Sequence, residues 1–128
     1  MITMRETSNC YVVNYISDGD IIGRLTVSKD KNAAKLAITG WYVNSSHQHQ
    51  GIGKALLKEL FANICVDNIK QIEYIWNGAN AYVGEWLKKF NAVSHCPLNV
   101  LKTLGEDTWE SHIYTLDREK FLSYVKSL

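Results

Sequence analysis

The sequence predicts one α/β domain of 128 residues, in which helices flank a mixed sheet. Three observations lead to this class. Runs of alternating β-branched and aromatic residues come first, and from Ile52 the apolar residues recur at helical spacing. Strand and helix patterns then alternate along the chain. We therefore expect an antiparallel N-terminal meander, followed by a parallel strand pair that a crossover helix joins.

The first half of the chain predicts three antiparallel strands. Residues Cys10–Ile16 and Ile21–Val27 are the first two, and Asp18-Gly19 between them is typical of a tight hairpin turn. A third strand follows within Ala34–Val43. Its alternation assigns Leu36, Ile38 and Tyr42 to one face and Ala37, Thr39, Trp41 and Val43 to the other.

The second half predicts a helix from about Ile52 to Cys65, a strand at Gln71–Trp76 and a second helix with Asn80 as its N-cap. Asn91 suits the left-handed position after that helix. Residues 92–111 predict a weak hairpin whose better strand is His112–Leu116. A closing helix follows, with Asp117 as its N-cap.

Composition and charge exclude several classes of protein. The formal net charge is +1 with scattered Lys and Arg, so nucleic acid is not an expected partner. No apolar run approaches 18 residues, which predicts no membrane span. The three cysteines are far apart, as in reduced proteins of the cytoplasm. His47 and His49 lack a second ligand pair, so we expect no metal site.

Two glycines stand immediately before the predicted helix, in "HQHQGIGKALLKEL". A strand, a loop and then Gly51-x-Gly53 can turn the backbone amides of residues 48–53 toward one phosphate group, where the helix dipole adds favourable potential. The alternative is that the glycines only ease a tight turn and the packing of helix on sheet. The spacing matches neither a P-loop nor a dinucleotide fingerprint, because the further glycines that these need are absent.

The block "WYVNSSHQHQGIGKALLKELF" resembles the GNAT family of acetyl-CoA-dependent N-acetyltransferases, whose signature is Gln or Arg, two residues, Gly, one residue, and Gly or Ala. A second block, "EYIWNGANAYVGEWLKKFNA", is similar to the family's fifth strand and following helix. The resemblance implies that acetyl-CoA is the cosubstrate, without a metal. It also implies transfer of the acetyl group to a primary amine of a small molecule or a protein.

The resemblance also implies which residues hold the cosubstrate. The pantetheine arm would lie along the strand backbone, the pyrophosphate on the loop and helix amides, and a backbone amide near Val43 would polarise the carbonyl oxygen. The implied binding residues are Trp41, Tyr42, Val43, Gln48, His49, Gln50, Gly51, Ile52, Gly53, Lys54 and Asn80.

Three departures from the family pattern limit these implications. One is Asn91-Ala92 where the family's helix ends in Gly-Phe, from which we expect a structural effect only. Leu87 occupies the position of the family's thiolate-protonating tyrosine, and leucine cannot donate a proton. The family fold begins with a strand and two helices, whereas nine residues precede the first predicted strand here. We therefore expect an acceptor site that is open or completed by a second subunit in a homodimer. A non-catalytic acyl-CoA-binding or protein-interaction module is the alternative function.

Glu73 on the predicted fifth strand is a candidate base for deprotonating the amine. A glutamate at the edge of a sheet or facing solvent is the commoner use of such a position. The four tryptophans, Trp41, Trp76, Trp86 and Trp109, could line an acceptor pocket, but their positions are more typical of core packing.

Overall fold

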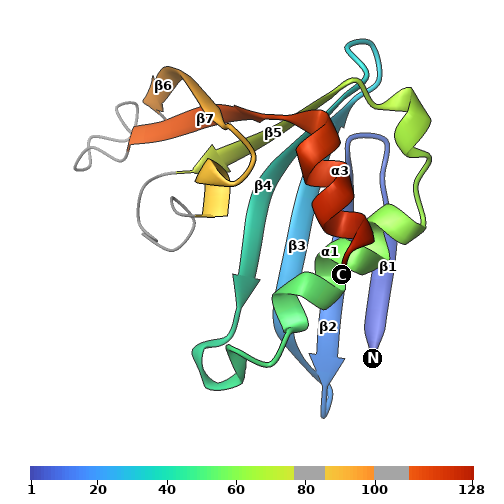
Figure 1. Ribbon diagram of the computed structural model, residues 1–128. Coiled ribbons are helices and arrows are strands. Elements are labelled where there is room, and N and C mark those ends of the chain that lie inside the picture. The colour runs from blue at the N-terminus through green and yellow to red at the C-terminus, as the bar shows by residue number, and fades with distance from the viewer. Residues whose placement is uncertain (77–85, 100–109) are drawn as a thin grey trace.

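The computed structural model describes residues 1–76, 86–99 and 110–128, and its centre is a seven-stranded sheet (Figure 1). The strand order is β1-β2-β3-β4-β5-β7-β6. The strands are β1 (Ile2–Glu6), β2 (Cys10–Ser17), β3 (Asp20–Asp30), β4 (Lys35–Val43), β5 (Gln71–Trp76), β6 (Val93–Asn99) and β7 (Glu110–Leu116). The helices are α1 (Ile52–Ala62) and α3 (Arg118–Lys126), with short 3₁₀ turns η1 (Ser45–His47) and η2 (Val66–Asn68).

The antiparallel meander has four strands, so the prediction of three was wrong. β1 pairs with β2 and is the outermost strand of the sheet. Only Ile2 and Met4 of β1 pack against the core, and two apolar residues in a five-residue strand are a weak sequence pattern. The hairpin turn is confirmed, because Asp18 and Gly19 have φ angles of 51° and 80° between β2 and β3.

The predicted parallel pair is also confirmed, and it is short. Only four residue pairs join the two strands: Lys35–Ile38 of β4 pairs with Gln71–Tyr74 of β5. Beyond Ile38 the described part of β5 offers β4 no further partner, so the two strands separate (Figure 1). The crossover helix α1 ends at Ala62 rather than at the predicted Cys65.

A β-bulge changes the face assignment within β4. Thr26 of β3 pairs with Gly40 and Val27 pairs with Ile38, so Thr39 is an extra residue. The extra residue places Ile38 and Trp41 on the same face. The predicted alternation, which put Trp41 opposite Ile38, was therefore wrong. The prediction failed because the spacing of apolar residues does not reveal how β4 pairs with β3.

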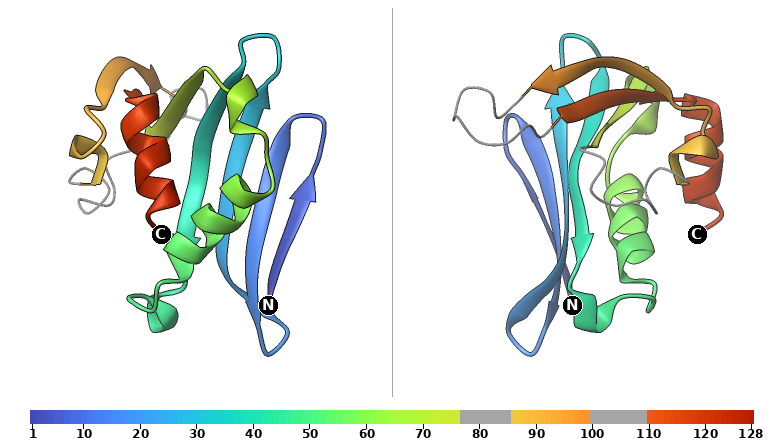
Figure 2. Two further views of the ribbon diagram at one scale, coloured as in Figure 1. Left: turned by 45° about the vertical axis from the view of Figure 1, so that its right-hand side comes forward. Right: turned by 90° about the vertical axis from the view of Figure 1, so that its left-hand side faces the viewer.

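Both α1 and α3 lie on one face of the sheet, and no described helix covers the other face (Figure 2). The core is enclosed between these helices and the sheet, and its largest fully buried side chains are Phe121, Leu25, Ile38, Leu56, Leu57, Leu60, Ile72, Val13 and Val27. Neither α1 nor α3 is long and apolar enough to cross a membrane, and no other helix among the described residues is.

The C-terminal part follows the prediction closely. The Asp117 side chain accepts a hydrogen bond from the Lys120 amide at 3.0 Å and caps α3. Asn91 has φ 48°, as expected after a helix end. β6 and β7 form the predicted hairpin, and β7 inserts between β5 and β6.

Candidate functional site

The loop from β4 to α1 ends in a backbone arrangement that suits an anion. His49 and Gly51 both have left-handed φ angles, 65° and 78°. Gly51 is the N-cap of α1, no side chain caps the helix, and no acidic residue lies in its first turn. The first bond within the helix runs from the Ala55 amide to the Gly51 carbonyl. The amides that precede Ala55 in the helix are therefore available for a ligand.

The space at Gly51 is open as well. No heavy atom lies within 4 Å of a β-carbon built at this position. A ligand can therefore approach the backbone there, which is what a bound pyrophosphate requires. The predicted loop residues 48–54 fit this group, and we name this backbone segment the anion cradle.

Gly53 has a different environment from Gly51. A β-carbon at Gly53 would lie 3.4 Å from Nε1 of Trp41. This indole nitrogen donates a hydrogen bond of 3.1 Å to the Gly53 carbonyl oxygen. The side of Gly53 that would carry a β-carbon therefore packs against β4, and the contact predicted between its backbone and a ligand stays a prediction.

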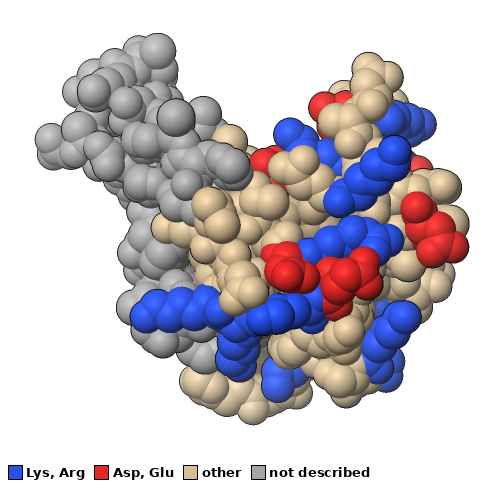
Figure 3. Space-filling view, turned by 45° about the horizontal axis from the view of Figure 1, so that its top comes forward, with Lys and Arg blue, Asp and Glu red and all other residues tan. Residues whose placement is uncertain are grey.

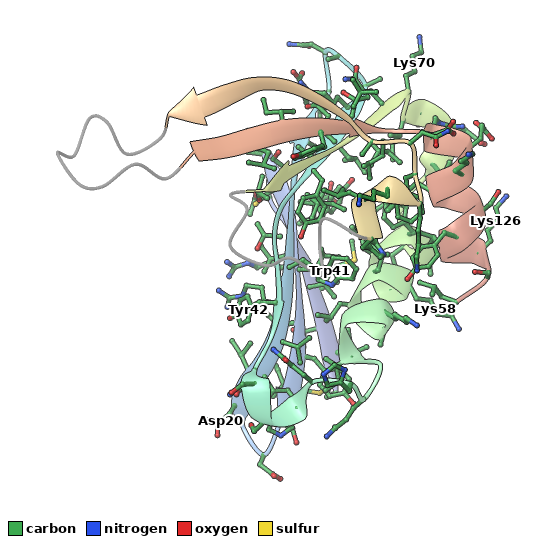
Figure 4. All side chains as sticks on the ribbon, turned by 60° about the vertical axis from the view of Figure 1, so that its left-hand side comes forward. Asp20, Trp41, Tyr42, Lys58, Lys70 and Lys126 are labelled. Atoms are coloured by element: carbon green, nitrogen blue, oxygen red, sulfur yellow. The ribbon has the colours of Figure 1, made fainter. Side chains whose placement is uncertain are left out.

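The strand beside the cradle has one edge free of β5. Trp41, Tyr42 and Val43 pair with β3 and lie beyond the last residue that pairs with β5. Trp41 points to the helix side of the sheet and Tyr42 to the other side (Figure 4). The Gln48 side chain donates to the Val43 carbonyl oxygen at 3.1 Å and so ties the cradle to the strand.

The second predicted block is described only in part. Asn80 lies outside the described residues. Leu87 is 3% exposed and belongs to the core, so it contributes packing and no proton. Trp86 is buried beside it, which confirms the core assignment of this tryptophan.

Glu73 is neither exposed nor at an edge, so the favoured interpretation from sequence was wrong. It is 7% exposed, because β7 pairs with β5 on the side away from β4. Its Oε1 lies 3.2 Å from the Lys35 ammonium, and its Oε2 accepts a hydrogen bond of 3.3 Å from Gln71. Ile72 and Tyr74 face the core, so Glu73 lies on the face that no described helix covers.

One histidine of the loop makes a local contact. His47 Nδ1 lies 2.9 Å from the Ser46 hydroxyl. Among the described residues, no three His, Cys, Asp or Glu side chains gather in a group that could hold a metal ion.

The comparison with family models decides the identity of this fold. Residues 2–80 match the model described as the acetyltransferase (GNAT) family. The chain belongs to this family. The matched segment includes the cradle, the strand edge beside it and Glu73. No curated protein sequence matches the chain.

Solved GNAT structures share the fold at low sequence identity. A putative acetyltransferase from Desulfovibrio desulfuricans is 18% identical, with TM-score 0.60, and the match covers 86% of this chain and 70% of that one. A putative streptothricin acetyltransferase from Bacillus anthracis, in complex with acetyl coenzyme A, is 20% identical, with TM-score 0.59 and coverage of 85% and 62%. The ribosomal-protein-S18-alanine N-acetyltransferase from Escherichia coli is 15% identical, with TM-score 0.61 and coverage of 86% and 69%. The chain thus spans about two thirds of the length of these proteins.

Proposed function

We propose that the protein transfers the acetyl group of acetyl-CoA to a primary amine. One observation carries this proposal: an uncapped helix start, with open space at left-handed Gly51, stands beside the place where β4 leaves β5. A pyrophosphate fits the first feature and an extended pantetheine arm fits the second. Membership of an acetyltransferase family supports the same cosubstrate.

On the donor side, the chain's own residues bind acetyl-CoA and orient its thioester. The amides of residues 48–54 hold the pyrophosphate, and the free edge of Trp41–Val43 holds the arm in an extended form. We propose Asn80 as a further contact. Bound acetyl-CoA supplies an activated thioester, and a backbone amide near Val43 stabilises the charge that develops on its oxygen.

On the acceptor side, we propose that Glu73 receives the proton that the amine loses. It is a carboxylate on the face without a described helix, and Lys35 and Gln71 hold its two oxygens in place. The Glu73 side chain is only 10% exposed, so the amine reaches it from this face directly or through one water, in an open site or in a site completed by a second subunit. On the face that Figure 3 shows, basic and acidic side chains are interspersed, and the formal net charge of the chain is only +1. Both observations support a small-molecule or protein amine rather than nucleic acid.

The decisive experiment measures thiol release from acetyl-CoA in the presence of a panel of primary amines, including small molecules and peptide N-termini. Release that depends on one class of amine, together with mass-spectrometric detection of the acetylated product, would support the proposal. Tight binding of acetyl-CoA without release for any amine would favour the non-catalytic acyl-CoA-binding module. The observation behind this alternative is Leu87, buried where the family has a tyrosine.

A further inference from the structure

Trp86 is the centre of an aromatic cluster on the helix side of the sheet. Its ring centroid lies 4.8 Å from that of Phe90 and 5.0 Å from that of Trp41. Tyr74, Phe121 and Tyr124 contact it at 5.8, 6.1 and 6.2 Å. These contacts account for its packing, since every pair has the edge-to-face arrangement that aromatic rings prefer.

The packing leaves one polar atom of Trp86 without a partner. The residue is 4% exposed, and its Nε1 is buried without a hydrogen bond in the described part of the chain. The neighbouring indole of Trp41 differs, because its Nε1 donates to the Gly53 carbonyl. Buried donors are almost always paired, so an unpaired indole N–H indicates an acceptor outside the described residues, and a bound ligand is one such acceptor.

The position of Trp86 indicates which acceptor this is. Tyr74 belongs to the last parallel pair before β4 and β5 separate, and Trp41 lies just beyond that point on β4. The Trp86 ring contacts both residues. It therefore spans the two strands at their separation, where the proposed function puts the pantetheine arm and not the nucleotide.

We propose that the indole N–H of Trp86 donates a hydrogen bond to the pantetheine arm of bound acyl-CoA and positions it between β4 and β5. This inference rests on the proposed function. The arm carries amide carbonyl oxygens, a hydroxyl and the sulfur, each of which can accept a hydrogen bond. An indole donates a hydrogen bond without losing its proton, so Trp86 is a positioning residue. It does not replace the proton-donating tyrosine whose position Leu87 occupies.

The test compares Trp86→Phe with the wild type by calorimetry, using acetyl-CoA, CoA and 3′-phosphoadenosine 5′-diphosphate. The phenylalanine keeps an aromatic ring in the cluster and removes only the N–H and part of the volume. We expect a loss of about tenfold in affinity for acetyl-CoA and CoA. Affinity for 3′-phosphoadenosine 5′-diphosphate, which has no pantetheine arm, should remain within about twofold. Equal losses for all three ligands, or no loss for any, would overturn the inference.

Phe90→Leu is the matched control for loosened packing. It removes a ring that contacts Trp86 and leaves the indole N–H in place. We expect a lower melting temperature without a selective loss of the two ligands that carry the arm. Selective loss of the same size in this variant would show that packing alone explains the Trp86→Phe result.

A measurement on the wild type covers the case in which Trp86→Phe does not fold. The chain has four tryptophans, so a ¹⁵N-labelled sample has four indole N–H resonances. The Trp86 resonance, assigned from its contacts to neighbouring rings, should shift on addition of CoA and stay in place with 3′-phosphoadenosine 5′-diphosphate. An unmoved resonance in a sample that binds CoA overturns this inference and leaves the proposed function intact. Absence of CoA binding to the wild type instead overturns the proposed function itself.

Discussion

At the residue scale, two neighbouring glycines of one motif have different surroundings. Gly51 combines a left-handed φ with open space, which suits a ligand. Gly53 lies against the Trp41 ring, where an added β-carbon would make van der Waals contact. The spacing of the motif does not reveal this difference, which only the surrounding atoms show.

The cradle is tested by Gly51→Asp against Gly51→Asn. Both side chains enter open space and both residues tolerate left-handed backbone, so both variants should fold. The aspartate adds a negative charge near the pyrophosphate, at a cost of about 1 to 4 kcal/mol. We expect CoA affinity to fall at least tenfold further in Gly51→Asp than in Gly51→Asn, measured by calorimetry. Similar affinities in two folded variants would exclude the cradle as the phosphate site.

The role of Glu73 is tested by Glu73→Gln. The amide keeps the shape of the side chain and cannot accept the amine proton, so kcat should fall by about 10²-fold or more. Steady-state kinetics at saturating acetyl-CoA measures this, with circular dichroism as the check on folding. Lys35→Gln is the control, since it removes the ion-pair partner and keeps the carboxylate. It should lower kcat less, and wild-type turnover in Glu73→Gln would rule out the base.

At the scale of elements, one side chain joins β4 to the start of α1. Trp41 reaches the helix because the bulge at Thr39 turns it to the helix face. Its hydrogen bond to the Gly53 carbonyl then holds the first turn of α1 beside the strand. The strand edge and the cradle, which would bind two parts of one cosubstrate, are therefore held at a constant separation.

Gly53→Ala tests whether the contact between Gly53 and Trp41 leaves room for a β-carbon. The added β-carbon would lie 3.4 Å from Trp41 Nε1, which is van der Waals contact, and alanine is the better helix former. We expect the free energy of unfolding to rise by about 0.5 kcal/mol, with CoA affinity within about threefold of the wild type. Urea denaturation and calorimetry measure the two quantities. A large loss of CoA affinity in the folded variant would show that the ligand lies against the Gly53 side that the β-carbon fills.

At the scale of the whole molecule, one face of the sheet carries the described helices and the core, and no described helix covers the other face. Ile72 and Tyr74 alternate with Glu73 along β5, so one strand serves both sides. Burial on the core side raises the pKa of Tyr74 to about 12. The stability of the fold should therefore depend on the protonation of this phenol.

Alkaline denaturation of Tyr74→Phe tests that dependence. Between pH 10 and 12 the phenol is ionised in the unfolded chain and protonated in the folded one, so the folded state binds more protons. Stability should be complete below pH 10 and fall by about 1.4 kcal/mol per pH unit above it through this group. In urea titrations, the free energy of unfolding of Tyr74→Phe should not show this part of the decline with pH. Parallel curves for the wild type and the variant over this range would contradict the assignment.

The sequence by itself determined the mixed α/β class, the hairpin at Asp18-Gly19, the crossover helix, the cap at Asp117 and the position of the cradle. Each depends on residues that are close together in the chain, where periodicity, turn chemistry and capping act. The family resemblance, confirmed by the match over residues 2–80, came from the same local block.

Only the tertiary structure decided the features that depend on pairing between distant segments. The bulge at Thr39 arises from the register of β3 against β4, and it alone turns Trp41 toward Gly53. Glu73 is buried because β7 pairs beside β5 and Lys35 reaches it from β4. The indole of Trp86, unpartnered among the described residues, is enclosed by rings from β4, β5 and α3. The spacing of residues along the sequence does not reveal these neighbours, because strand register and burial follow from the arrangement of the whole sheet.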